Sequence, residues 1–219
     1  CGTNSNCEQT FCTLTSGWYN PANGFSDDID WRTNNGPTPS NQTGPSVDHN
    51  PGTGTGNYLY LEASGGCDSS VAYLMSPCID LTSASSPVLS FWYHMFGANM
   101  GTLGVDIFDG SEWHYDVIPV ISGNQGTSWK EQQVNLLPYI GNTIVIRFRG
   151  KTGNDFAADV SIDDIGIFEN SQSPLANFNQ DNAQTCMDGV VNFTDISQNS
   201  PTSWSWDIQP NTFAFVNGS

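Results

Sequence analysis

The ten residues PVLSFWYHMF (87–96) decide the fold class of this 219-residue chain. In an extended strand, successive side chains point to opposite faces. Here both faces carry bulky groups, with Leu89, Phe91, Tyr93 and Met95 on one and Ser90, Trp92, His94 and Phe96 on the other. The segment is therefore predicted to be a central strand that is covered on both sides.

Similar short segments recur along the chain between clusters of Gly, Asn and Pro, and helix-period patterns are nearly absent. The segment TIVIRFRG (143–150) alternates between an apolar face and a wetter face that holds Arg147, which predicts an outer or concave sheet surface. Seven or more short strands imply an all-β sandwich or jelly roll. The clearest strands are expected at 58–63, 71–75, 87–96, 102–108, 130–136, 143–150 and 160–168.

Charge and composition exclude several classes of partner. Five Lys and Arg against 22 Asp and Glu give a net charge of −17, which repels nucleic acid and anionic membrane surfaces. No apolar stretch is long enough to span a membrane, and the first residues resemble no signal peptide. The turn-rich composition is typical of a mature secreted, extracellular or cell-surface protein.

A polar break at Asn170-Ser-Gln-Ser-Pro174 divides the chain. We expect a first domain over 1–170, a linker over 171–174 and a second domain over 175–219. The second domain contains only two strand-like runs, GVVNFTD (189–195) and SWSWDI (203–208). Two strands bury little core, so this domain is expected to be incomplete.

The six cysteines contain no C-x-x-C pair, and this favours disulfides over a zinc site. Cys67 and Cys78 flank the apolar segment 71–75 and are predicted to close a short loop. The N-terminal cysteines leave an odd thiol that pairs with Cys186 or with a residue beyond this chain. The remaining cysteines are Cys1, Cys7, Cys12 and Cys186.

Eight motifs in order resemble a MAM domain of the bacterial secreted kind, over about residues 13 to 170. They are DDIDW (27–31), GPTPSNQTGP (36–45), DH (48–49), YLYLEAS (58–64), SPCIDL (76–81), FWYHMFGANMGTL (91–103), GNQGTSW (123–129) and IDDI (162–165). One departure is that FCTLTSGW (11–18) lacks the Glu that usually follows the opening Phe. The resemblance implies a two-sheet jelly roll.

The tail VVNFTDISQNSPTSWSWDI (190–208) resembles the first half of a PKD domain. That resemblance implies a partial immunoglobulin-like β-sandwich for 175–219. The later strands of such a domain are not in this sequence.

Acidic residues in two places suggest a bound cation. Asp163 and Asp164 are adjacent within an apolar strand, so at least one is buried unless a bulge turns both outward. With five basic residues in the chain, a cation is the simpler partner for a buried carboxylate. Similar jelly rolls carry a structural calcium, and the matching positions are Glu62 and Asp163 or Asp164, with Asp28 and Asp30 as further candidates. There are two alternatives. The ion is sodium, or there is no ion and the acids bond to water and to backbone amides.

The segment DGSEWHYD (109–116) is the predicted ligand-binding loop. Sugar rings stack on Trp and Tyr while polar groups take the hydroxyls, so Trp113, His114, Tyr115 and Arg147 are the candidate ligand-binding residues. A Trp that folds back over a sheet edge is the alternative for any one of them.

No motif of nucleophilic, zinc-protease or nucleotide chemistry is present, so intrinsic catalysis is not expected. The first hypothesis is a non-catalytic module that binds a polysaccharide, preferably a neutral glycan, and is attached to a secreted enzyme or surface protein. A protein–protein adhesion module is the alternative. A third hypothesis, part of a secreted hydrolase or protease, needs two carboxylates that face each other across a cleft.

Overall fold

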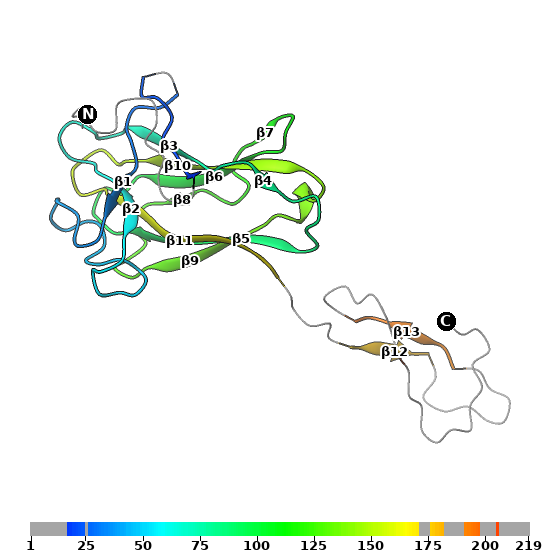
Figure 1. Cartoon of the computed structure of the whole chain (residues 1–219). Helices are drawn as coiled ribbons and strands as arrows, with labels where there is room; N and C mark the ends of the chain where they lie inside the picture. The colour runs from blue at the N-terminus through cyan, green and yellow to red at the C-terminus, as the bar shows by residue number, and fades with distance from the viewer. Residues whose placement is uncertain (1–16, 25, 171–175, 182–190, 198–204, 206–219) are drawn as a thin grey trace. The chain divides into compact units, whose positions relative to one another are not determined.

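The computed structural model describes residues 17–24, 26–170, 176–181, 191–197 and 205. The chain forms two compact units, Cys1–Asn170 and Ser171–Ser219 (Figure 1). Residues Cys1, Cys7, Cys12 and Cys186 lie outside the described part of the chain.

The first unit is an all-β sandwich of two sheets, which appear as two layers in Figure 1. The first sheet has five antiparallel strands in the order β1-β2-β11-β5-β9. Each of the seven expected segments contains a strand, so the predicted fold class is confirmed. The strands of this sheet are β1 Arg32–Asn34, β2 Tyr58–Leu61, β5 Pro87–Met95, β9 Lys130–Asn135 and β11 Val160–Glu169.

The second sheet has the order β3-β10-β6-β7, with β4 paired to β10 and β8 to β6. Its strands are β3 Val71–Met75, β4 Ile79–Asp80, β6 Thr102–Phe108, β7 Trp113–His114, β8 Ile121–Ser122 and β10 Thr143–Lys151. A short 3-10 helix, Leu137–Tyr139, leads into β10. Among the described residues there is no apolar helix of membrane-spanning length.

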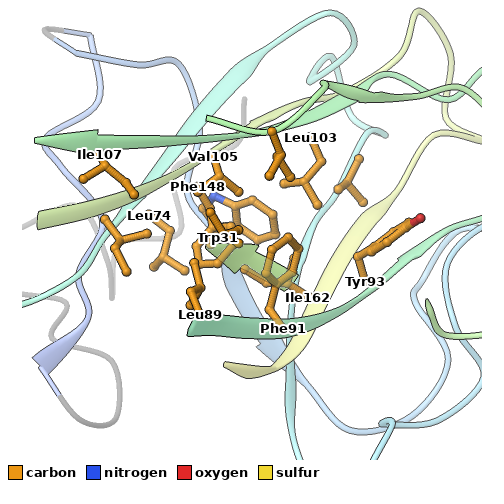
Figure 2. Packing of buried hydrophobic residues seen from close by; sticks show 14 of the residues in the cluster. Trp31, Leu74, Leu89, Phe91, Tyr93, Leu103, Val105, Ile107, Phe148 and Ile162 are labelled. Carbon is orange, nitrogen blue, oxygen red and sulfur yellow. The ribbon is translucent and has the colours of Figure 1, made fainter. Parts of the chain in front are cut away.

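Strand β5 is covered on both sides, as its sequence predicts. Its inward side chains Leu89, Phe91 and Met95 are fully buried in the core between the sheets. The outward face is covered by other parts of the chain, because the His49 ring stacks on Trp92 with centroids 3.7 Å apart. The core residues come from both sheets, and Figure 2 shows Phe91 close to Phe148 and Trp31.

Gly150 in β10 permits the closest packing in this core. A Cβ at this position would lie 2.8 Å from Cζ2 of Trp31 and would also collide with Leu61. Because real Cβ atoms do not approach so closely, any larger residue would displace the fully buried Trp31.

The predicted disulfide between Cys67 and Cys78 is wrong, since both are free thiols, one buried and one exposed. Strand β3 lies between them in the chain. An extended strand rises about 3.3 Å per residue, so five residues span about 16 Å, whereas a disulfide needs Cα atoms within about 7 Å. The apolar strand that makes the two cysteines conspicuous in the sequence also separates them.

The described part of the second unit is a two-stranded antiparallel sheet of β12 Phe178–Gln180 and β13 Phe193–Asp195. The rings of Phe178 and Phe193 meet edge to face with centroids 5.6 Å apart. Of the second expected run, 203–208, only Ser205 is described.

Candidate ligand face and candidate cation site

An arginine surrounded by aromatic rings lies on the outer face of the second sheet. The guanidinium carbon of Arg147 is 4.2 Å from the ring centroid of Trp113, 4.4 Å from that of Tyr73 and 5.4 Å from that of Tyr115. These residues come from three strands and the segment after β7. Alternation along β10 turns Arg147 outward because its neighbours Ile146 and Phe148 are buried in the core. We call this set of four residues the aromatic face.

Asp106 of β6 anchors the aromatic face from below. It is directly opposite Arg147 in the ladder and is fully buried. Its Oδ2 accepts hydrogen bonds from Nε and Nη2 of Arg147 at 2.9 and 2.8 Å, and from Nε of Arg149 at 3.2 Å. Its Oδ1 accepts the backbone N–H of Asp116 at 2.9 Å. Burial would raise the pKa of Asp106, but the Arg149, Asp116 and Arg147 bonds together outweigh it and hold the pKa below its ordinary value.

Arg147 and its neighbour Arg149, two residues further along β10, are already neutralised by acidic residues. Arg149 also pairs with the carboxylate of Asp116, so two acids balance two guanidinium groups. Gly104 faces Arg149, and a Cβ there would lie 3.0 Å from the guanidinium. Because Gly104 has no side chain, β6 leaves room for the guanidinium of Arg149.

Tyr115 is the member of the face that is open to solvent, with an exposed fraction of 62%. Arg147 has an exposed fraction of 9%, and its donors are directed to Asp106. The sequence places Trp113, Tyr115 and Arg147 together as ligand contacts, and the structure does bring them together. It gives Arg147 a supporting position beneath the rings, with Tyr115 exposed to solvent.

His114 does not belong to the aromatic face. It follows Trp113 in β7, and its ring packs edge to face against Tyr139 at 5.4 Å. Its Nε2 lies 2.8 Å from Oδ2 of Asp109. Adjacent residues of a strand point in opposite directions, which separates His114 from the other predicted ligand residues.

A second candidate site lies where β2 ends and β11 begins, and it consists of two buried carboxylates. Leu61 pairs with Val160 in the antiparallel ladder, so the next positions bring Glu62 opposite Asp159. Asp159 is fully buried and Glu62 is 7% exposed. We call Glu62 and Asp159 the acidic pair.

Each carboxylate of the acidic pair has one oxygen with a partner and one without. Oδ1 of Asp159 accepts the N–H of Ala63 at 3.0 Å, and Oε1 of Glu62 accepts the hydroxyl of Ser40 at 2.8 Å. Oδ2 of Asp159 and Oε2 of Glu62 are buried without a hydrogen-bond partner. Burial, with a contribution from the charge of Glu62, raises the pKa of Asp159 to about 6. Two unmatched carboxylate oxygens in one buried place are suited to a hard cation.

The family model of the MAM domain (meprin/A5/mu) matches residues 6–172. The chain belongs to the MAM family. Among curated relatives, Neuropilin-1a of Danio rerio is 31% identical over 208 residues, covering 88% of this chain and 21% of that protein. MAM domain-containing glycosylphosphatidylinositol anchor protein 2 of Mus musculus is 31% identical over 157 residues, covering 66% of this chain and 16% of that protein. The chain thus spans about a fifth or less of these relatives.

Solved structures with a similar shape include the K1 cleaved adhesin domain of Lys-gingipain from Porphyromonas gingivalis, with a TM-score of 0.49 and 19% identity. That match covers 72% of this chain and 94% of the adhesin domain. The structure of TmCBM61 in complex with beta-1,4-galactotriose has a TM-score of 0.38 and 16% identity, covering 52% of this chain and 70% of that one.

In this MAM domain, Asp163 and Asp164 lie away from Glu62. Asp163 lies in β11 and follows Asp159, the residue before that strand, by four positions, which is about 13 Å along an extended chain. A β-bulge between Asp163 and Gly166 turns the chain, and Asp164 adopts a φ of 46°. Asp163 accepts the backbone N–H of His49 at 2.8 Å, and Asp164 Oδ2 lies 2.6 Å from Nδ1 of His49. These acids fasten the segment that carries His49 rather than join the acidic pair.

The acids of DDIDW lie at the edge of the MAM domain's second sheet. Asp27 accepts the N–H of Tyr73 at 2.7 Å, and Asp28 accepts the N–H of Val71 at 2.9 Å. Burial raises the pKa of Asp27 to about 6, with smaller contributions from Asp30 and Asp28. Because β3 is an edge strand, these carboxylates bond backbone amides that no neighbouring strand reaches. Asp28 is therefore held at the edge of the second sheet, whereas Glu62 follows a strand of the first sheet.

Asp159 and Asp106 are not among the residues predicted from the sequence. Asp159 directly precedes an apolar strand, and Asp106 stands among apolar residues in TLGVDIF (102–108). An acid inside or next to a strongly apolar run is the signal that would have drawn attention to both. The partners of these two acids, Arg147 for Asp106 and Glu62 for Asp159, come from other segments of the chain. The ladder register determines which residues meet.

Proposed function

We propose that this chain is a non-catalytic extracellular binding module whose aromatic face binds a polysaccharide. The observation that carries the proposal is the exposed ring of Tyr115, which shares Arg147 with the rings of Trp113 and Tyr73 on the outer face of the second sheet. Sugar rings stack their apolar faces on such rings. MAM membership, with relatives that carry the domain as a small part of a longer protein, supports a module rather than a complete enzyme.

The charge of the aromatic face favours a neutral glycan. Asp106 and Asp116 balance Arg147 and Arg149, so no basic charge is left over for a sulfate or uronate. The chain as a whole carries −17, which repels anionic polymers further.

We propose a structural calcium ion at the acidic pair, held by Glu62 and Asp159. The fit rests on the two buried carboxylate oxygens that lack partners. A bound calcium ion would supply the positive charge that neither residue finds in the protein, and carboxylate oxygens are the ligands it prefers. Asp159 also fixes the neighbouring segment, because its backbone N–H donates to Oγ1 of Thr43 at 2.9 Å. Sodium is the alternative ion for the same ligands.

We further propose that the MAM domain is of the bacterial secreted type and that 175–219 begin a PKD-like sandwich. The antiparallel pairing of β12 with β13 supports the second point. In a longer protein, such a pair of modules would hold an attached secreted enzyme near its polysaccharide.

Binding of the full chain to soluble neutral and acidic polysaccharides by isothermal titration calorimetry, with calcium and again with EDTA, tests this function. We expect saturable binding to a neutral glycan and about 3- to 10-fold weaker binding for Tyr115→Ala, because one stacking ring is lost. Phe156→Ala is the matched control, since Phe156 is a 50% exposed ring outside the aromatic face. Equal loss in both variants would reject the site. No glycan binding with concentration-dependent self-association would favour the adhesion module instead.

A further inference from the structure

The turn between β6 and β7 brings together three side chains that bind metal ions. Asp109, Glu112 and His114 each offer one ligand atom, and these atoms all lie within 4.8 Å of one another. One donor is an imidazole nitrogen and two are carboxylate oxygens. The set lies outside both sites described above, because His114 points away from the aromatic face and the acidic pair belongs to the other sheet.

The turn holds Asp109 in one orientation. Its Oδ1 accepts the N–H and the hydroxyl of Ser111 at 2.8 and 2.7 Å, and the N–H of Glu112 at 2.9 Å. Its Oδ2 faces Nε2 of His114 at 2.8 Å. The one carboxylate oxygen that the turn does not use is therefore the one that faces the imidazole.

Glu112 and His114 complete the set. They are the residues directly before and after Trp113 in the chain. The His114 ring packs edge to face on Tyr139, which restricts its rotation. Within the described residues, no Lys or Arg forms an ion pair with Asp109 or Glu112. Two carboxylates that no described Lys or Arg neutralises thus share one small region with an imidazole.

We propose that Asp109, Glu112 and His114 form a surface binding site for a divalent transition metal of the zinc class. An imidazole nitrogen with carboxylate oxygens suits zinc, nickel and copper, whereas calcium takes oxygen ligands alone. Three protein ligands leave at least one position for water or for a group of a ligand. The imidazole distinguishes this site from the calcium site proposed at the acidic pair.

A metal at this site would cross-link the turn that carries Trp113. Asp109 precedes the turn, while Glu112 and His114 flank Trp113 on either side in the chain. Joining them through one ion would fix the β6–β7 pairing, in which Phe108 lies opposite Trp113. The metal site itself does not depend on whether the aromatic face binds a glycan.

Isothermal titration of the full chain with zinc chloride, in excess calcium and with accessible thiols alkylated, tests the proposal. Calcium fills the oxygen-only site, and alkylation removes competition from exposed cysteines such as Cys78. We expect one zinc equivalent whose Kd rises at least 10-fold in His114→Gln and in Glu112→Gln, because each removes one metal ligand. His49→Gln is the matched control. His49 also faces a carboxylate, that of Asp164, but the described residues supply no third ligand group within 4.8 Å there.

A second readout separates ligand loss from misfolding. Cobalt in a tetrahedral protein site absorbs visible light much more strongly than the cobalt aqua ion. This increase in absorption should be lost in His114→Gln, while the circular dichroism spectrum stays that of the wild type. Wild-type zinc binding that His114→Gln leaves unchanged would overturn the proposal. So would the lack of any zinc binding by the wild type, whatever the outcome of the polysaccharide titrations.

Discussion

Asp106 and Asp159 are two fully buried carboxylates in the same sandwich, and the protein treats them in opposite ways. Asp106 accepts bonds from two arginines and a backbone amide, and its pKa is lowered despite burial. Asp159 has one oxygen without a partner, and burial raises its pKa to about 6.

The difference shows where each buried charge finds its compensation. Burying a carboxylate is costly unless a positive charge or a full set of hydrogen bonds accompanies it. Asp106 has that partner within the chain, and Arg147 in turn supports the rings of the aromatic face. Asp159 faces Glu62 instead, so its compensation comes from a proton or from a cation.

The largest effect is expected from Asp106→Asn, which keeps the size of the side chain and removes the charge. Arg147 would then be buried with no charged partner opposite it, and breaking a buried ion pair costs about 3–5 kcal/mol of the free energy of unfolding. Urea denaturation measures this loss. Asp68→Asn, at an exposed position, should stay within about 0.5 kcal/mol. A small loss for Asp106→Asn would mean that Asp106 is no better compensated than Asp159.

The effect of Asp159→Asn on the free energy of unfolding should change sign when calcium is added. In EDTA at pH 7 the variant loses an uncompensated buried charge, and its free energy of unfolding should rise by about 2 kcal/mol. Calcium at about 1,000 times its Kd would stabilise the wild type by about 4 kcal/mol and leave the variant unchanged, so the order reverses. Thermal melts of both proteins in EDTA and in calcium give the measurement. A variant that is less stable than the wild type in both conditions would count against the cation.

The pH dependence of stability should also separate the two carboxylates. For Asp159 the folded pKa of about 6 exceeds the ordinary value of 3.8, so the folded state binds the extra proton. Its contribution to stability is then fully present below about pH 4 and lost as the pH rises through 6. In EDTA, the difference between the wild type and Asp159→Asn should grow by about 2 kcal/mol from pH 4 to pH 6. Urea denaturation at several pH values measures it, and a constant difference would contradict the raised pKa.

The smallest effect is expected from Gly104→Ala, which tests how tightly the arginines are held. The new Cβ would lie 3.0 Å from Arg149, whose flexible end must move, while Arg147 still pairs with Asp106. Replacing a strand glycine gains about 0.5–1 kcal/mol, which offsets part of the disturbance. We expect a net change within about 1 kcal/mol by urea denaturation. A much larger loss would show that Arg149, rather than Arg147, is the main partner of Asp106.

Part of the aromatic face could be predicted because it depends on local rules. Alternation along 143–150 turns Arg147 outward, and the turn-rich segment 109–116 places Trp113 and Tyr115 near one another. Side-chain alternation in β7 also separates His114 from Trp113. The sequence-based prediction grouped the two residues because it treated 109–116 as one loop. That Arg147 supports the rings from beneath follows from Asp106, which lies on another strand.

The partner of Glu62 and the pairing of two cysteines could not be predicted from the sequence. Glu62 was expected beside Asp163 or Asp164, but the ladder places it opposite Asp159. Likewise Cys67 and Cys78 are eleven residues apart in sequence, yet remain unpaired free thiols. The family resemblance misplaced the partner of Glu62, and closeness along the chain was a poor guide to the pairing of the two cysteines.

The sequence by itself determined the all-β class, the covered central strand β5 and the outward direction of Arg147. These follow from side-chain alternation, which is a property of neighbouring residues in an extended chain. Only the tertiary structure decided that Asp106 meets two arginines while Asp159 meets Glu62. The physical reason is that strand register is set by the packing of both sheets together, and a shift of one residue would exchange every partner.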